Sequence, residues 1–258
     1  MAIDMALARE LPEGEGILRI YRWARPTLSL GRNQPARNVY DESAPRFLGG
    51  EIVRRPTGGR EVLHDRELTY AVILPLEALG GLRESYRILN EALVQALRSL
   101  GADVRLAPWS GPTPSPAAGD CFREAAEGEI EARGRKLVGS AQVRVGRTLL
   151  QHGSILLAPP SLSLDSFRVS PEGYEESRTD RSPSGASAGR ELRRAPGITL
   201  AEVLPGGVGF RGVGAAVEAA MAGTLGGKWK EGRLREGESS SAEALLRKYR
   251  SSSWTWRR

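Results

Sequence analysis

The stretch that decides the fold of this chain reads GRKLVGSAQ over residues 134–142 and LLQHGSILL over residues 149–157. Apolar residues make up most of the second segment and the Leu-Val pair in the first, which is typical of strands. With Cys121 upstream, this region holds the only cysteine of the chain, one of its two histidines (His152), and Lys136 between short glycine turns. Cysteine, lysine and histidine carry out covalent acyl chemistry in enzymes. The pattern therefore predicts a β-rich region that bears a reaction centre.

Length and composition indicate a globular protein. The 258 residues suit one large α/β domain with room for a small appendage, and 40% hydrophobic and 26% charged residues are ordinary values. No apolar run is long enough to span a bilayer, and residues 1–10 lack the layout of a signal peptide. We therefore expect no membrane partner. Because a single cysteine forms no internal disulfide, we expect a cytoplasmic protein.

The charge balance calls for an explanation, since the net charge is +6 and the pI is near 9.8. No zinc-finger, RNP-type or helix-turn-helix pattern occurs, and aromatic residues make up only 6% of the chain. Both observations argue against a nucleic-acid partner. Two interpretations stay open: a solvated basic surface, and a surface that binds an acidic protein.

Hydrophobic periodicity predicts the helices and strands. The clearest helix spans residues 83–100, where one apolar stripe ends at Gly101. Further helices are expected over residues 1–9, 34–48, 198–203, 213–222 and 239–249, and strands over residues 17–23, 28–30, 51–55, 68–74 and 103–106.

Three connections carry predictions of their own. The strands at 17–23 and 28–30 fit two adjacent strands joined by a turn. A loop is expected over residues 108–120, and the polar, serine-rich stretch 171–196 is expected to be partly disordered. The pair Gly58-Gly59 lets backbone approach a ligand closely and can present N–H groups to an anion. A plain hairpin turn is the alternative for this glycine pair.

Three motifs in register resemble the biotin/lipoate protein ligase superfamily, and most closely its lipoyl and octanoyl branch. RRPTGGREVLHD at residues 54–65 resembles the family's ligand-binding loop, GRKLVGSAQ at 134–142 its catalytic-lysine strand, and LQHGSILL at 150–157 the next strand. Weaker matches at 29–34 and 248–254 follow the same order. The resemblance implies an α+β fold, in which a mixed, largely antiparallel β-sheet is flanked by helices. It also implies a catalytic domain over residues 1–225 and a small C-terminal helical extension, residues 226–258, packed on it.

The pair Cys121-Phe122 resembles the nucleophile position of cysteine-dependent octanoyltransferases. Such enzymes move an octanoyl group from acyl carrier protein to a lysine of a lipoyl domain, whereas ligases of the same family activate free lipoate with ATP. Arg60 stands where many ligases carry a third glycine, which favours the transferase. An ATP-dependent lipoate-protein ligase and a non-catalytic binding module of the same fold stay open as alternatives.

The resemblance also implies partners and cofactors. Acyl carrier protein is the expected donor, and the expected acceptor is a lipoyl-domain protein, either the glycine cleavage H protein or a dehydrogenase E2. No cofactor is expected, and ATP with Mg would be needed only by the ligase alternative.

The expected catalytic residues are Cys121 as nucleophile and Lys136 as the ammonium that stabilises its thiolate. Each also has a structural interpretation, as a small buried hydrophobe and as a solvated surface lysine. The expected substrate-binding residues are Arg55, Thr57, Gly58, Gly59, His64, Gly139, Ser140, Ala141, His152 and Gly153.

Histidine and apolar positions leave further expectations. Either histidine could bond a backbone carbonyl instead of lining the pocket. No metal site is expected, because neither histidine has the spacing of a metal ligand and no second cysteine exists. Leu63, Tyr70 and Val138 are candidates for an apolar slot that holds the acyl tail.

Overall fold

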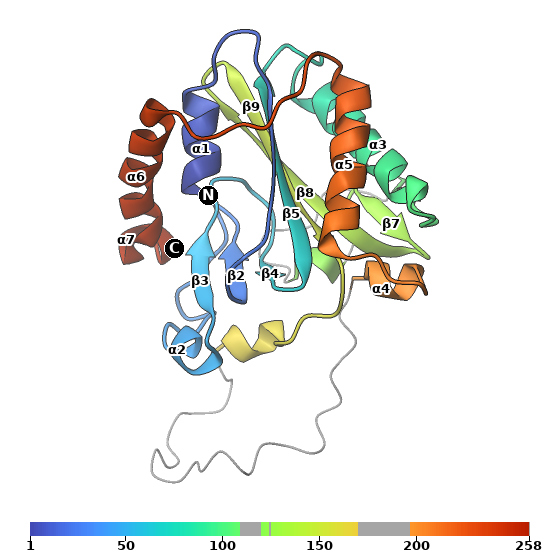
Figure 1. Ribbon diagram of the computed structural model, residues 1–258. Coiled ribbons are helices and arrows are strands. Elements are labelled where there is room, and N and C mark those ends of the chain that lie inside the picture. Colours follow the sequence, from blue (N-terminus) through green and yellow to red (C-terminus); the bar gives the residue numbers. More distant parts are fainter. Residues whose placement is uncertain (109–119, 124, 170–196, 258) are drawn as a thin grey trace, which may run out of the picture.

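Two β-sheets form the centre of the computed structural model, which describes residues 1–108, 120–123, 125–169 and 197–257 (Figure 1). The larger sheet has six antiparallel strands in the order β1 (Ile17–Tyr21), β5 (Glu67–Pro75), β9 (Thr148–Leu156), β8 (Arg135–Val145), β7 (Ile130–Ala132) and β6 (Arg105–Leu106). In the smaller sheet, β2 (Thr27–Leu30) lies parallel to β3 (Glu51–Arg54) and antiparallel to β4 (Val62–His64). The predicted α+β fold, with a mixed and largely antiparallel sheet, is confirmed.

Helices cover both faces of the larger sheet (Figure 1). The long ones are α3 (Leu82–Ser99) and α5 (Phe210–Leu225) on one face and α1 (Ala2–Arg9) and α6 (Glu236–Arg250) on the other. The short ones are α2 (Ala44–Leu48), α4 (Leu200–Val203) and α7 (Ser252–Thr255), and single 3₁₀ turns occur at Cys121–Arg123 and Leu164–Phe167. The helix predicted over residues 83–100 is thus confirmed as α3.

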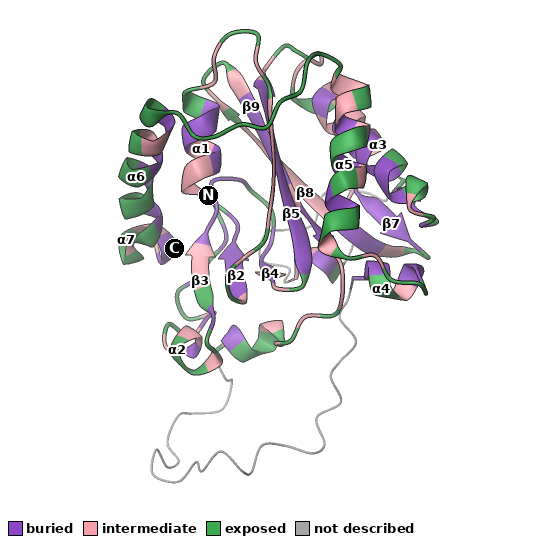
Figure 2. Cartoon of the chain, viewed as in Figure 1, coloured by how far each residue is buried: buried purple, intermediate pink, exposed green. Residues whose placement is uncertain are grey.

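Strand β5 is buried on both faces, which explains its nearly continuous apolar sequence (Figure 2). Because successive side chains of a strand point to opposite faces, Tyr70 and Val72 pack in the cluster of α3 and α5. Ala71 and Ile73 pack with Leu7 of α1 on the other face. This strand therefore joins the two hydrophobic layers and fixes the sheet between them.

Two predictions about the N-terminal third are wrong. The strands expected to be neighbours lie in different sheets, because β1 pairs with β5 whereas β2 pairs with β3 and β4. Backbone hydrogen bonds to strands distant in the sequence place the two strands in different sheets. The short connection at residues 22–26 carries the chain from one sheet to the other. The helix expected over residues 34–48 shrinks to α2, because the preceding turns include Asn38 with φ 61°, outside the right-handed helical region.

The other predicted helices, the predicted loops and the predicted C-terminal extension compare with the structure as follows. Helices α1 and α4 lie within the predicted ranges 1–9 and 198–203, and α5 and α6 extend beyond the predicted ranges 213–222 and 239–249 at both ends. Thr199 caps α4, and its backbone N–H donates to the Glu202 carboxylate. The loop over 108–120 and the stretch 171–196 lie almost wholly outside the described residues. Helix α6 packs on α1 through Ala242, Leu245 and Tyr249; the division at residue 225 stays a prediction. Within the described residues, no helix is both long and apolar enough to cross a membrane.

Candidate active site

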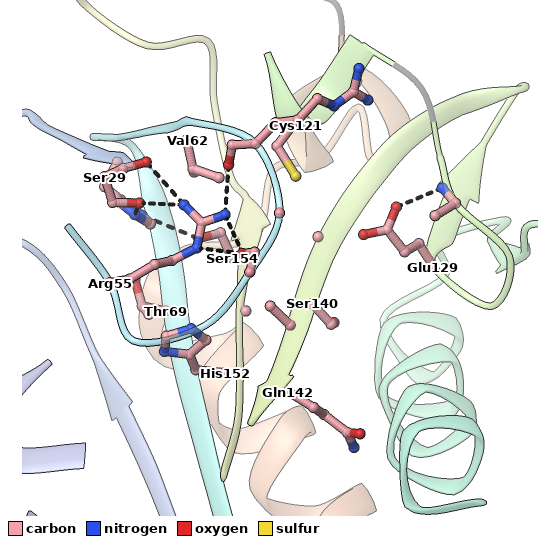
Figure 3. A pocket seen from close by; sticks show the side chains of 18 of the residues that line it. Ser29, Arg55, Val62, Thr69, Cys121, Glu129, Ser140, Gln142, His152 and Ser154 are labelled. Atoms are coloured by element: carbon pink, nitrogen blue, oxygen red, sulfur yellow. Dashed lines mark hydrogen bonds between the residues drawn. The ribbon is translucent and has the colours of Figure 1, made fainter. Parts of the chain in front are cut away.

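A cavity of about 340 Å³ is lined by residues of both sheets (Figure 3). Its size falls in the range of sites that hold small molecules. The predicted site residues that line it are Cys121, Lys136, Arg55, Gly58, Gly59, His64, Gly139, Ser140, Ala141, His152 and Gly153. Thr57 is not among the lining residues but lies behind one of them, since its hydroxyl is 2.7 Å from His152 Nε2.

Lys136 places its amino group directly beside Cys121. The Lys136 Nζ lies 3.3 Å from Cys121 Sγ and donates a hydrogen bond of 2.9 Å to the Cys121 carbonyl oxygen. The cysteine is held by its own backbone N–H, which donates to the Glu61 carbonyl oxygen at 3.0 Å. Asp120 caps the same turn by accepting a hydrogen bond of 2.8 Å from the backbone of Phe122. The fold therefore brings together the two side chains predicted to react.

The carboxylate of Glu129 is the third member of this cluster. Its Oε2 lies 2.5 Å from Lys136 Nζ, and 2% and 5% of the lysine and glutamate side chains are exposed. It also accepts a 2.7 Å hydrogen bond from the Ala126 backbone (Figure 3). Burial opposes the charge of Lys136, but the negative charges of Cys121 and Glu129 outweigh it and raise the pKa of Lys136. Sequence patterns did not single out Glu129, because it lies in a turn before β7 and no spacing rule links it to Lys136.

Arg55 holds the loop that contains Gly58 and Gly59 by hydrogen bonds to its backbone. Its guanidinium donates to the carbonyl oxygens of Ser29 at 3.0 Å, Gly58 at 2.8 Å and Arg60 at 2.6 Å (Figure 3). The loop needs glycine at Gly59, where φ is +88° and a Cβ would stand 2.9 Å from the Arg55 guanidinium. Burial lowers the pKa of Arg55, and the negative charges of Cys121 and Glu61 oppose that shift. Arg55 thus holds the wall of the cavity and adds positive charge to it.

Both histidines line the cavity and are also hydrogen-bonded within the protein. His64 Nδ1 is 2.6 Å from Glu67 Oε1, and its Nε2 is 2.7 Å from the Ser29 hydroxyl. Trp23 stacks on the His64 ring with centroids 4.4 Å apart. No group of three or more His, Cys, Asp or Glu side chains in the described parts of the chain could hold a metal ion.

Burial lowers the pKa of His152 to about 3, so its imidazole is neutral in the folded protein near neutral pH. The unfolded imidazole binds a proton near pH 6.5, so the stability linked to His152 is complete above that pH. It is lost as the pH falls from 6.5 toward 3. We expect wild type to lose about 2 kcal/mol more than His152→Gln between pH 8 and pH 5, measured as the free energy of unfolding in urea. Equal losses in the two proteins would show that His152 is protonated when folded.

Packing requires glycine at Gly153 and leaves little room for a side chain at Gly139, two further lining positions. A Cβ on Gly153 would stand 2.5 Å from the Gly139 carbonyl oxygen and 2.7 Å from the Tyr70 ring. A Cβ on Gly139 would stand 3.1 Å from Lys136 Cε. The neighbouring Ser140 hydroxyl bonds the Tyr70 hydroxyl at 2.7 Å. These contacts let β8 and β9 run close together at the floor of the cavity.

The residues expected to form an apolar slot do not line the cavity. Tyr70 and Val138 are fully buried in the main core, and Leu63 packs in the cluster of the smaller sheet. Adjacent strand residues face opposite ways, so Val62 lines the cavity where Leu63 cannot. The apolar and aromatic lining comes instead from Met1, Tyr21, Trp23, Val62, Tyr86, Ala126 and Ala141.

Known proteins are similar to this chain in sequence and in fold. The family model of the lipoyl protein ligase A/B catalytic domain matches residues 1–203. The octanoyltransferase LipM of Kyrpidia tusciae is 36% identical over all of this chain and 94% of its own length, and that of Symbiobacterium thermophilum is 37% identical over all of this chain and 93% of its own. The structure of protein Ta0514 from T. acidophilum with bound lipoic acid superimposes with a TM-score of 0.76 at 24% identity, covering 100% of this chain and 92% of that one. The chain therefore belongs to the lipoyl protein ligase A/B catalytic-domain family.

Proposed function

We propose that this protein is an octanoyltransferase of protein lipoylation that works through a thioester on Cys121. The observation that carries the proposal is the 3.3 Å contact between Lys136 Nζ and Cys121 Sγ at the wall of the cavity. A thiolate is the reactive form of cysteine, and a neighbouring ammonium stabilises it. The prediction that the chain is an acyltransferase enzyme is confirmed by the two relatives, which are octanoyltransferases and match the whole chain. The thioester on Cys121 is the part that is proposed here.

The reaction consists of two acyl transfers. In the first, Cys121 Sγ attacks the thioester of octanoyl-acyl carrier protein, the donor's carbon–sulfur bond breaks, and the carrier leaves as a thiol. In the second, a lysine amine of the acceptor attacks the Cys121 thioester, an amide forms, and Cys121 recovers its thiol. Gly139 and Ser140 are neighbours in β8, which pairs with β9 at both positions, so their N–H groups point in opposite directions. Only the one that points away from β9 is a candidate to stabilise the oxyanion of each tetrahedral intermediate.

No cofactor is needed for these two acyl transfers, because the incoming thioester supplies the activated acyl group. Arg60 supports a transferase, since its side chain is 7% exposed and lines the cavity at the position where many ligases have glycine. The acceptor is a lipoyl-domain protein, which the net charge of +6 would attract if the domain is acidic. The lone thiol must stay reduced to react, which fits work in the cytoplasm.

Intact mass spectrometry tests the proposal. Incubation of the protein with octanoyl-acyl carrier protein, without ATP, is expected to add one octanoyl group that hydroxylamine removes, as it does a thioester. Addition of a lipoyl-domain protein is expected to discharge the adduct and to modify the acceptor at one lysine. An enzyme that acquires no adduct, yet modifies the acceptor only with ATP and free lipoate, would be a ligase.

A further inference from the structure

The Lys136 ammonium has three acceptors for its three N–H donors. These are Glu129 Oε2 at 2.5 Å, the Cys121 carbonyl oxygen at 2.9 Å and Cys121 Sγ at 3.3 Å. A charge as deeply buried as that of Lys136 needs an anion beside it. When Cys121 is a neutral thiol or a thioester, Glu129 is the one side chain in the described part of the chain that forms an ion pair with Lys136.

We infer that Glu129 is a positioning residue that keeps Lys136 protonated through both acyl transfers and competes with the Cys121 sulfur for its positive charge. The inference rests on the proposed function, because that function makes Cys121 and Lys136 the reacting pair. Lys136 then stays positively charged beside the sulfur throughout. It does not give up its proton to become the base that deprotonates the acceptor amine.

The proton balance of both steps agrees with a permanent ammonium. In the first transfer the bond from Cys121 Sγ to the acyl carbon forms, and the proton of the cysteine ends on the thiol of the donor. In the second transfer that bond breaks, and the proton released by the acceptor amine ends on Cys121 Sγ. Lys136 stabilises the sulfur anion as entering nucleophile and then as leaving group, and it is an ammonium before and after each step.

The sign of the effect of Glu129 on the pair follows from Coulomb's law. A negative charge beside two acids disfavours the loss of a proton from either of them. Replacing the carboxylate with a neutral amide should therefore lower the pH at which the Cys121–Lys136 pair first loses a proton. The same replacement should lower the pH at which Lys136 loses its own proton. The rising and the falling limb of the pH–rate profile should therefore both move to lower pH.

Other charged and titratable groups face the same cluster. They are Arg55, Arg60, Glu61, Tyr70, Tyr86 and Asp120. The Phe122 ring adds a cation–π contact, with its centroid 5.4 Å from Lys136 Nζ. A Glu129 variant leaves all of these residues in place, so a difference between wild type and variant reports on the loss of the Glu129 charge.

Alkylation of the thiol by iodoacetamide across a range of pH tests the inference. Glu129→Gln keeps an oxygen for the Ala126 N–H, and the single cysteine makes the reading by intact mass unambiguous. The pH of half-maximal alkylation rate is expected to fall by about one unit or more in this variant. Glu127→Gln is the matched control, because it removes the same charge from an exposed position two residues away and should leave the midpoint unchanged.

Glu129→Asp supplies a second measurement that decides the question even if the amide variant does not fold. The shorter side chain keeps the charge but moves it away from Lys136, so its midpoint should lie below that of wild type and above that of Glu129→Gln. Unchanged midpoints, together with slower octanoyl transfer at every pH, would mean a merely structural carboxylate and would overturn the inference. Alkylation needs no acyl donor, so a wild type without transferase activity but with this order of midpoints would reject only the proposed function.

Discussion

The Cys121→Ala variant is expected to lose octanoyl transfer by about three orders of magnitude or more, down to the rate without enzyme. The reason is that, in the proposed mechanism, the acyl group passes through a thioester on Cys121, and the chain offers no second cysteine to hold it. The variant should also acquire no octanoyl adduct by intact mass. Because Cys121 is half-buried and its sulfur is held mainly by Lys136, removal of the sulfur should cost little stability.

Two controls separate the possible outcomes of this experiment. A thermal melting temperature close to that of wild type shows that the loss is chemical. Supplying ATP and free lipoate to the variant tests the ligase alternative directly. Lipoylation that survives in Cys121→Ala and depends on ATP would reject the thioester mechanism.

The Lys136→Met variant is expected to slow octanoyl transfer about 100-fold to 1000-fold at pH 7, the loss typical when one charge-stabilising donor is removed. Methionine keeps most of the volume and removes the ammonium, so the Cys121 thiolate loses its nearest positive charge. The defect should shrink as the pH rises toward 8.5, where an ordinary thiol ionises without help. Transfer and alkylation rates measured across that pH range provide the test.

This substitution leaves the buried Glu129 carboxylate without its partner, and breaking a buried ion pair costs about 3–5 kcal/mol. The double variant Lys136→Met, Glu129→Gln removes both charges and should regain much of that stability without regaining activity. Lys136→Arg keeps the charge in a larger head group and should retain more activity than Lys136→Met at pH 7. A Lys136→Met enzyme that works at the wild-type rate at pH 7 would contradict the assigned role.

Local sequence was sufficient for the elements whose signals lie within one stretch of chain. The apolar stripe that ends at Gly101 identified α3 to within one residue at each end. The motif at residues 134–142 singled out Lys136 and the glycine turn before it, and the three motifs together identified the family. The second turn expected at Gly139 and Ser140 is wrong, because both residues lie within strand β8 and pair with β9. These features follow from side-chain period, turn chemistry and recurring motifs, all of which can be read from neighbouring residues.

Only the tertiary structure decided which strands pair and which side chains meet. The strand at 17–23 pairs with β5, not with β2, because hydrogen bonding to a distant strand outweighs nearness in sequence. Val62 faces the cavity and Leu63 the core, a choice set by the register of β4 on β2. Glu129 reaches Lys136 because β7 pairs with β8 through a bulge beside Ile130.

By itself, then, the sequence determined the family, the long helix and the cysteine and lysine that are predicted to react. The fold added the distance between them, the anion that keeps the lysine charged, and the walls of the cavity. The physical reason is that a buried ion pair forms only where separate strands bring its members together out of water, and that placement depends on the packing of the whole chain.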